Sequence, residues 1–138
     1  MARYDKVEPL SGSFRAPLNA DWLSADLNKI VPVSLNTSGK VVKGTAGQTG
    51  FIGVLCLTGL QVGAVWQGIK YANDVVDVMQ DGEIVELTGL IAGQRYFAAA
   101  DGNSLVPASG TITGLQMVGW TVEATRMIVR CQTGKNIT

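Results

Sequence analysis

Residues 117–132, MVGWTVEATRMIVRCQ, decide the fold class of this chain. Apolar and polar residues alternate through two runs, 117–124 and 126–132. A period of two residues is typical of β-strands that rest one face on a core. The alternation puts Trp120 on the apolar face, in the core or at an interface between copies, and Thr121 on the opposite face. Met127 starts the apolar face of the second run.

The same period extends back towards the N-terminus and predicts further short strands. Their ranges are 30–35, 40–43, 51–58, 74–79, 83–88, 94–100 and 104–107. Asp81-Gly82 and Asp101-Gly102 are typical hairpin turns between neighbouring strands. Pro32 favours an edge or the start of its strand, because proline cannot donate to a ladder. The continuous apolar run 51–58 indicates a strand that is buried on both faces.

One helix is predicted, over residues 19–29. Asn19 can cap it, and Leu23, Leu27 and Ile30 share one face at helical spacing. No strand alternates with a long helix, which excludes the βαβ folds. The expected fold is therefore mainly β, a small β-barrel or β-sandwich with one short N-terminal helix and an extended N-terminal arm.

The 138 residues are enough for one domain. We expect an extended arm over residues 1–18, a single β-rich domain over 19–132 and a polar C-terminal tail over 133–138. The arm carries two aromatic residues, Tyr4 and Phe14, which a purely solvated tail would rarely contain. It therefore lies either on a partner or against its own domain.

Composition excludes several classes of function. The chain has no histidine, and its two cysteines, Cys56 and Cys131, lie far apart in apolar runs. Ser–His and Cys–His nucleophiles and His-ligated metal sites are therefore excluded. Eleven basic residues balance eleven acidic ones, which gives no electrostatic footprint for nucleic acid. We expect no enzyme, cofactor or metal. Only 16% of residues are charged, against about 25% in a typical domain, so part of the surface is expected to be covered by a partner.

Residues 50–69 contain no charged side chain, and the stretch is long enough to cross a bilayer. Five glycines and two glutamines interrupt it, so two buried strands joined by a Thr-Gly turn fit better than a membrane span. The first residues lack the apolar core of a signal peptide. We expect a soluble protein made in the cytoplasm and not bound to a membrane.

Three segments in succession carry a resemblance to a known family. They read DVVDVMQDGEIVEL from Asp74, AGQRYFAAADGNSLVP from Ala92 and VGWTVEATRMIVR from Val118. Their order and spacing resemble the small capsid decoration (cement) proteins of tailed bacteriophages. The likeness covers residues 30–131 and leaves the region 19–29 and the polar tail unassigned.

The resemblance implies a β-rich, β-tulip-like protein, often trimeric, on the outer surface of the virion. Its partner would be the major capsid protein, whose adjacent subunits it would clamp against the pressure of packaged DNA. The N-terminal arm would make the contact, through Arg3, Tyr4, Leu10, Phe14 and Trp22, and deletion of residues 2–16 would abolish binding. Two alternatives stay open. One is another phage structural subunit of the tail tube, head completion or fibre base. The other is a β module that binds a small ligand or glycan in a pocket formed by Trp66, Tyr71 and Trp120.

Overall fold

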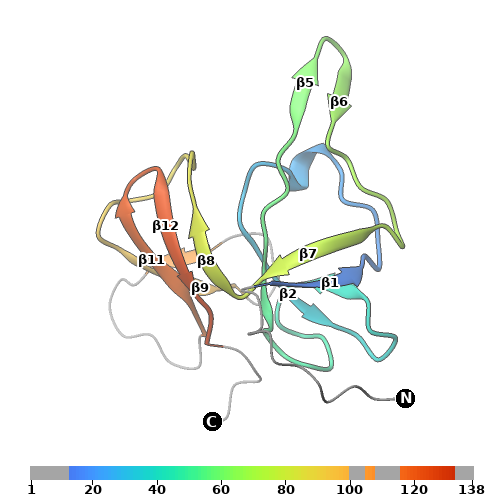
Figure 1. The fold of residues 1–138 in the computed structure, drawn as a ribbon, viewed down its shortest axis with the longest axis horizontal. Coiled ribbons are helices and arrows are strands. Elements are labelled where there is room, and N and C mark those ends of the chain that lie inside the picture. The colour runs from blue at the N-terminus through green and yellow to red at the C-terminus, as the bar shows by residue number, and fades with distance from the viewer. Residues whose placement is uncertain (1–12, 100–104, 108–115, 133–138) are drawn as a thin grey trace, which may run out of the picture.

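The computed structural model describes residues 13–99, 105–107 and 116–132 and is mainly β, as expected. Two five-stranded antiparallel sheets and one projecting hairpin make up the fold (Figure 1). The first sheet has the order β1 (Ser13–Pro17), β7 (Val75–Met79), β4 (Gly53–Leu55), β2 (Val31–Leu35) and β3 (Val41–Lys43). The second has the order β10 (Leu105–Pro107), β9 (Arg95–Ala98), β11 (Met117–Glu123), β12 (Arg126–Arg130) and β8 (Asp81–Ile84). The hairpin consists of β5 (Leu60–Val62) and β6 (Val65–Gln67). In the described part of the chain both sheets are open, and neither closes into a barrel.

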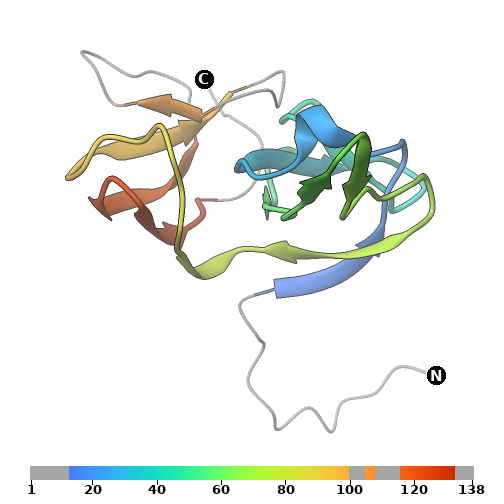
Figure 2. The same cartoon turned by 90° about the horizontal axis from the view of Figure 1, so that it is seen from above.

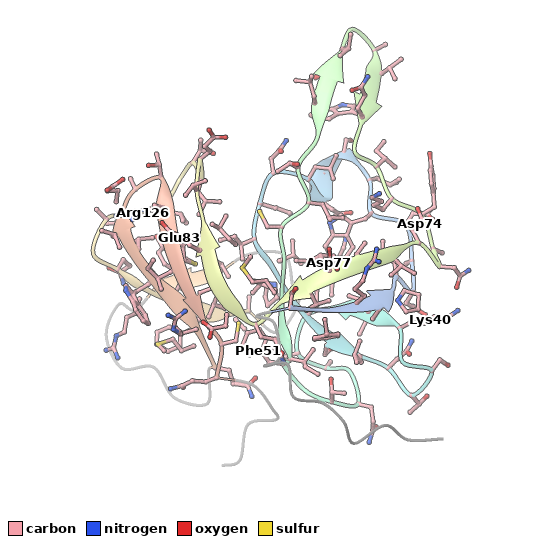
Figure 3. The ribbon with its side chains drawn as sticks, in the orientation of Figure 1. Lys40, Phe51, Asp74, Asp77, Glu83 and Arg126 are labelled. Carbon is pink, nitrogen blue, oxygen red and sulfur yellow. The ribbon has the colours of Figure 1, made fainter. Side chains whose placement is uncertain are left out.

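The two sheets form two lobes that lie side by side (Figure 2), and strand β4 of the first sheet contributes side chains to the cores of both. Leu55 of β4 belongs to the core of the first lobe, whereas Val54 belongs to the core between β4 and the second sheet. Phe51, fully buried, lies where the lobes converge (Figure 3). The strand predicted to be buried on both faces is therefore confirmed for Gly53–Leu55. Pro32 is the second residue of β2, close to the predicted strand start, but β2 lies inside the sheet and not at its edge.

The predicted hairpin at Asp81-Gly82 is wrong. Strand β7 pairs with β1 and β4, whereas β8 pairs with β12, so the chain crosses from one sheet to the other at Gln80. The backbone oxygen of Gln80 accepts a hydrogen bond from Cys131 N at 3.0 Å, which ties this crossing to the end of β12. Alternation along a strand does not reveal which partner the strand takes. The second predicted hairpin turn, Asp101-Gly102, falls between strands β9 and β10, which do pair with each other.

The predicted helix over 19–29 is also wrong, because only one turn of 3-10 helix, Ser24–Asp26, forms there. Backbone groups that a helix would need are bound elsewhere: Trp22 exchanges hydrogen bonds with Lys70 at 2.7 and 3.1 Å. Eleven residues rich in Asn, Asp and Ser make a marginal helix, so these tertiary bonds prevail. Among the residues described, no helix is long and apolar enough to cross a bilayer.

Strand β11 does not face the core as its alternation suggests. Trp120 and Val122 are 37% and 46% exposed, while Thr121 between them is 2% exposed. A bulge at Met117–Gly119 against β9 turns both Val118 and Gly119 inward. A Cβ at Gly119 would collide with the carbonyl oxygen of Ile128, so the bulge requires glycine here.

Thr121 is buried because its hydroxyl has backbone partners. It donates to the carbonyl oxygen of Ile91 and accepts from Gln94 N at 3.0 Å. A buried hydroxyl with such partners avoids the cost of an unsatisfied polar group. These bonds hold the 91–94 turn against the second sheet. Trp120 is consequently a surface residue, which excludes the core position and leaves its predicted interface role untested.

Candidate interaction surface

The predicted contact residues of the N-terminal region separate into two groups. Arg3, Tyr4 and Leu10 lie outside the described residues. Phe14 lies in β1 and packs, half-buried, against the core of the first lobe. Trp22 is only 2% exposed; its Nε1 donates to the backbone oxygen of Asp26 at 3.0 Å. In this structure Trp22 is a core residue, because its indole has no free surface to offer.

Strand β1 anchors the end of the N-terminal region to the first sheet. Its five residues pair antiparallel with β7 from Ser13 opposite Met79 to Pro17 opposite Val75. Leu18, next along the chain, is fully buried in the first core. Residues 13–18 of the predicted arm therefore pack against their own domain.

The three aromatic residues of the glycan-pocket alternative lie on separate elements. Trp66 is in β6, Tyr71 lies in the loop before β7, and Trp120 is in β11 of the other sheet. Figure 1 places β6 and β11 in different lobes. The structure therefore does not bring these three side chains together.

An exposed apolar surface lies instead on the β5–β6 hairpin. Val62 pairs with Val65 and Leu60 with Gln67, so Leu60, Val62 and Val65 share one face of the two-stranded ribbon. They are 62%, 56% and 64% exposed. The opposite face carries Trp66, which packs against the first core. We call the three aliphatic side chains the hairpin face.

The sequence prediction for this region is half right. It expected buried strands throughout 50–69, but burial ends with Leu55 and the following strands project from the body (Figure 1). The glycines of this stretch are the sequence feature that could have predicted the hairpin. Gly59 and Gly68 bracket the base of the hairpin, and Gly63, with a φ of 62°, forms its tip.

Close contacts hold the base of the hairpin in place. The Asn28 carboxamide donates to Gly59 O at 3.1 Å and accepts from Gly59 N at 2.9 Å. A Cβ at Gly59 would collide with Leu27, and one at Gly68 would collide with the backbone oxygen of Thr58. Only glycine permits this approach, so the hairpin leaves the body in a defined direction.

A groove of about 770 Å³ lies between the two sheets. Aliphatic side chains from β4, β7 and the β8 region line much of it: Val54, Val75, Ile84, Val85 and Leu87. Strand β8 ends the second sheet, so one of its edges has no strand partner among the described residues. We call this cavity the intersheet groove. Its position, between an open sheet edge and an apolar wall, suits the binding of another polypeptide.

Five charged side chains line the groove, and three of them have charged partners within the protein. Arg15 Nε lies 3.2 Å from Asp77 Oδ1 in the first lobe, and Arg126 Nη1 lies 3.1 Å from Glu83 Oε1 in the second. Figure 3 shows Asp77 on β7 and Glu83 beside Arg126 on the facing lobe. The hydrogen bond to Glu83, with the charge of Glu123, raises the pKa of Arg126. The groove therefore has two ion pairs at its rim, together with the exposed side chains of Lys70 and Glu86.

Both cysteines are free thiols with raised pKa values. Burial raises the pKa of Cys56, which lines the intersheet groove. Burial and the charge of Asp81 raise the pKa of Cys131 to about 12. A protonated thiol is a poor nucleophile, so these residues behave as packing groups at neutral pH. Within the described residues, no cluster of three or more metal-ligating side chains occurs.

Comparison with known proteins shows a likeness of fold. No protein-family model matches the chain, and no curated protein matches it. A solved structure of a chain from Mycobacterium phage Patience is similar, with a TM-score of 0.76 and 20% sequence identity. The match covers 96% of this chain and 97% of the phage chain. The two chains therefore share a fold over nearly their whole lengths.

Proposed function

We propose that this chain is a structural virion protein of a tailed bacteriophage, which binds the outer surface of the capsid and clamps adjacent major capsid subunits. The observation that supports this most is the fold shared with a Mycobacterium phage chain over 96% of the sequence. The resemblance of residues 30–131 to capsid decoration proteins adds support from the sequence. The host cytoplasm would be the site of synthesis and the virion the final location.

The exposed apolar side chains fit a protein that functions by burying apolar surface against its partners. Apolar area removed from water contributes about 25 cal/mol per Å². The hairpin face exposes three aliphatic side chains, and residues 50–69 around it carry no charge. A homotrimer would repeat each modest contact three times, and linked contacts raise the overall affinity without new chemistry.

The N-terminal region is the proposed source of the capsid contact. Arg3, Tyr4 and Leu10 precede β1 and keep their predicted role. Phe14 and Trp22 contribute to the first core, so their part in the contact would be to anchor the segment. Because the chain has no net charge, we do not expect nucleic acid to take part in this contact.

Co-sedimentation with mature, undecorated heads of the phage that encodes the chain tests the proposal. Saturable binding at a fixed ratio to the major capsid protein is the expected result, and the ratio gives the number of sites. Absence of binding by folded protein to intact heads would overturn it. Ring-shaped oligomers of the purified chain would then favour the tail-tube or head-completion alternative.

A further inference from the structure

The hairpin is built as a stiff projection with an uncovered apolar face. An isolated two-stranded hairpin is marginally stable in water and needs packing on at least one face. Here Trp66 supplies that packing at the base, and the Asn28–Gly59 pair fixes the exit direction. The hairpin face beyond it, with Val62 opposite Val65, is more than half exposed at each of its side chains and belongs to neither core of the described chain. Such a face is suited to insertion into an apolar recess.

The same chain carries a recess of matching character. The intersheet groove has aliphatic walls, and at its rim Arg15 is paired with Asp77 and Glu83 with Arg126. Lys70 and Glu86 also line it, and both side chains are exposed, so they can stay in water when the aliphatic walls are covered. A charged ligand would compete with the two ion pairs, and its burial against the aliphatic walls would be costly. An uncharged ribbon can enter without disturbing them.

Strand edges match as well. Strand β8 is four residues long and has one edge without a strand partner among the described residues. Strands β5 and β6, three residues each, form a sheet of two, so each also has an edge unpaired within the described chain. Unpaired edges are templates for pairing with another chain. Addition of the hairpin to β8 would satisfy backbone groups on both sides.

We propose that the β5–β6 hairpin of one copy of this chain occupies the intersheet groove of a second copy. One contact then covers the hairpin face, the aliphatic walls of the groove and two open strand edges. The contact joins different surfaces of the two copies, so copies related by rotation can close into a ring. It is independent of capsid binding and can be tested in the absence of phage heads.

A native thiol in the groove provides a sharp test. Cys56 lines the groove, so a Val62→Cys substitution on the hairpin should bring a second thiol close to Cys56 of another copy. With copper phenanthroline as oxidant, the full-length variant should form covalent dimers. Cys56→Ser in the same background should abolish them, whereas Cys131→Ser should leave them unchanged. Dimers that survive Cys56→Ser, or no dimers at all, would overturn the proposal.

Charge substitutions test the same contact without a cross-linking reaction. Sedimentation velocity of the wild-type chain should show self-association, and Val62→Lys should weaken it at least tenfold. Gln61→Lys is the matched control, because it adds the same charge on the other face of the same strand. Equal effects of the two variants, or a wild-type chain that stays monomeric at high micromolar concentration, would contradict the proposal.

Complementation separates a specific contact from general loss of solubility or folding. Val85→Lys alters the groove wall at a side chain that is 58% exposed, so the fold should tolerate it. Each variant alone should be impaired, but a mixture of Val62→Lys and Val85→Lys chains retains one intact hairpin and one intact groove. Native mass spectrometry of the mixture, with one chain isotopically labelled, should show 1:1 mixed pairs. Mixed pairs no more abundant than self-pairs would overturn the assignment of the two surfaces.

Discussion

The side chain of Asn28 forms two hydrogen bonds with the backbone of Gly59, 31 residues further along the chain, at 3.1 and 2.9 Å. The carboxamide thus bonds both the backbone N–H and the backbone oxygen of Gly59 at the base of the hairpin. Asn28 has a φ of 60°, a conformation that asparagine tolerates better than most residues. The pair links the chain after the 3-10 turn to the projecting ribbon.

Loss of this pair should loosen the hairpin while the body stays folded. Asn28→Gly keeps the left-handed backbone accessible and removes both hydrogen bonds, which should cost about 1 kcal/mol. Amide exchange in β5 and β6 should accelerate roughly fivefold, a factor that corresponds to this energy, while β11 amides keep their rates. Asn73→Gly, at another left-handed asparagine with a φ of 73°, is the control. Uniform acceleration throughout the chain would contradict a local role.

Gly119→Ala should be strongly destabilising. Its Cβ would collide with the backbone oxygen of Ile128, which cannot move without breaking the β11–β12 ladder. Overpacking of this kind costs about 3 kcal/mol, measurable by urea unfolding. Gly93→Ala meets no neighbouring atom and has only an unfavourable φ of 67°, so it should cost about 1 kcal/mol. Equal losses for the two variants would show that the bulge tolerates a side chain.

Thr121→Val should destabilise the fold despite its closely similar shape. The valine leaves Gln94 N without its side-chain acceptor and Ile91 O without its donor, at a site that is 2% exposed. Loss of these partly buried bonds should cost about 1 kcal/mol. Thr125→Val, at an exposed turn, should change the free energy of unfolding by less than about 0.5 kcal/mol. Thermal and urea unfolding of both variants measure the difference.

Stability should fall as the pH rises above about 9, in part because of Cys131. Its pKa rises from an ordinary 9.0 to about 12 in the folded chain, through burial and the charge of Asp81. Between these values the unfolded thiol loses its proton while the folded thiol keeps it, so the unfolded state binds fewer protons and stability declines. Cys131→Ala should flatten the dependence between pH 9 and 11 in urea titrations. An unchanged slope would mean that the thiol ionises in the folded state.

Truncation of residues 2–12 should abolish binding to phage heads and leave the fold intact. The cut must stop before Ser13, because Ala16 and Leu18 belong to the first core and β1 pairs with β7 along its whole length. Removal of residues 2–16, the limit suggested by sequence alone, would also remove most of β1. Head co-sedimentation and thermal unfolding of the truncated chain measure the two effects separately. Full-affinity binding by the truncated chain would exclude the arm as the contact.

Most strands could be predicted from the sequence because a period of two reports local geometry. The runs at 75–79, 95–98 and 126–130 were all expected within a few residues. Local sequence patterns could not exclude the helix predicted over residues 19–29. Its spacing of Leu23, Leu27 and Ile30 is genuine, but Leu23 is 47% exposed and Trp22 pairs with Lys70 instead.

The candidate surfaces were hidden from sequence reasoning for a related reason. Burial of an apolar residue depends on which element covers it, and the covering element can come from anywhere in the chain. Val54 and Val65 are alike in type and lie in the same uncharged stretch, yet the first is fully buried and the second is 64% exposed. The intersheet groove arises only because β7 and β8 take partners in different sheets.

The sequence by itself determined the mainly β fold, the approximate positions of most strands and the absence of histidine chemistry, since each depends on residue type or on neighbours along the chain. Tertiary structure alone decided how strands β7 and β8 divide between two sheets, which face of β11 is buried and where the hairpin projects. Those features depend on long-range pairing, such as Val54 opposite Met79 and Thr121 beside Ile91. Periodicity specifies that a strand has two faces, but only packing specifies which of them meets water.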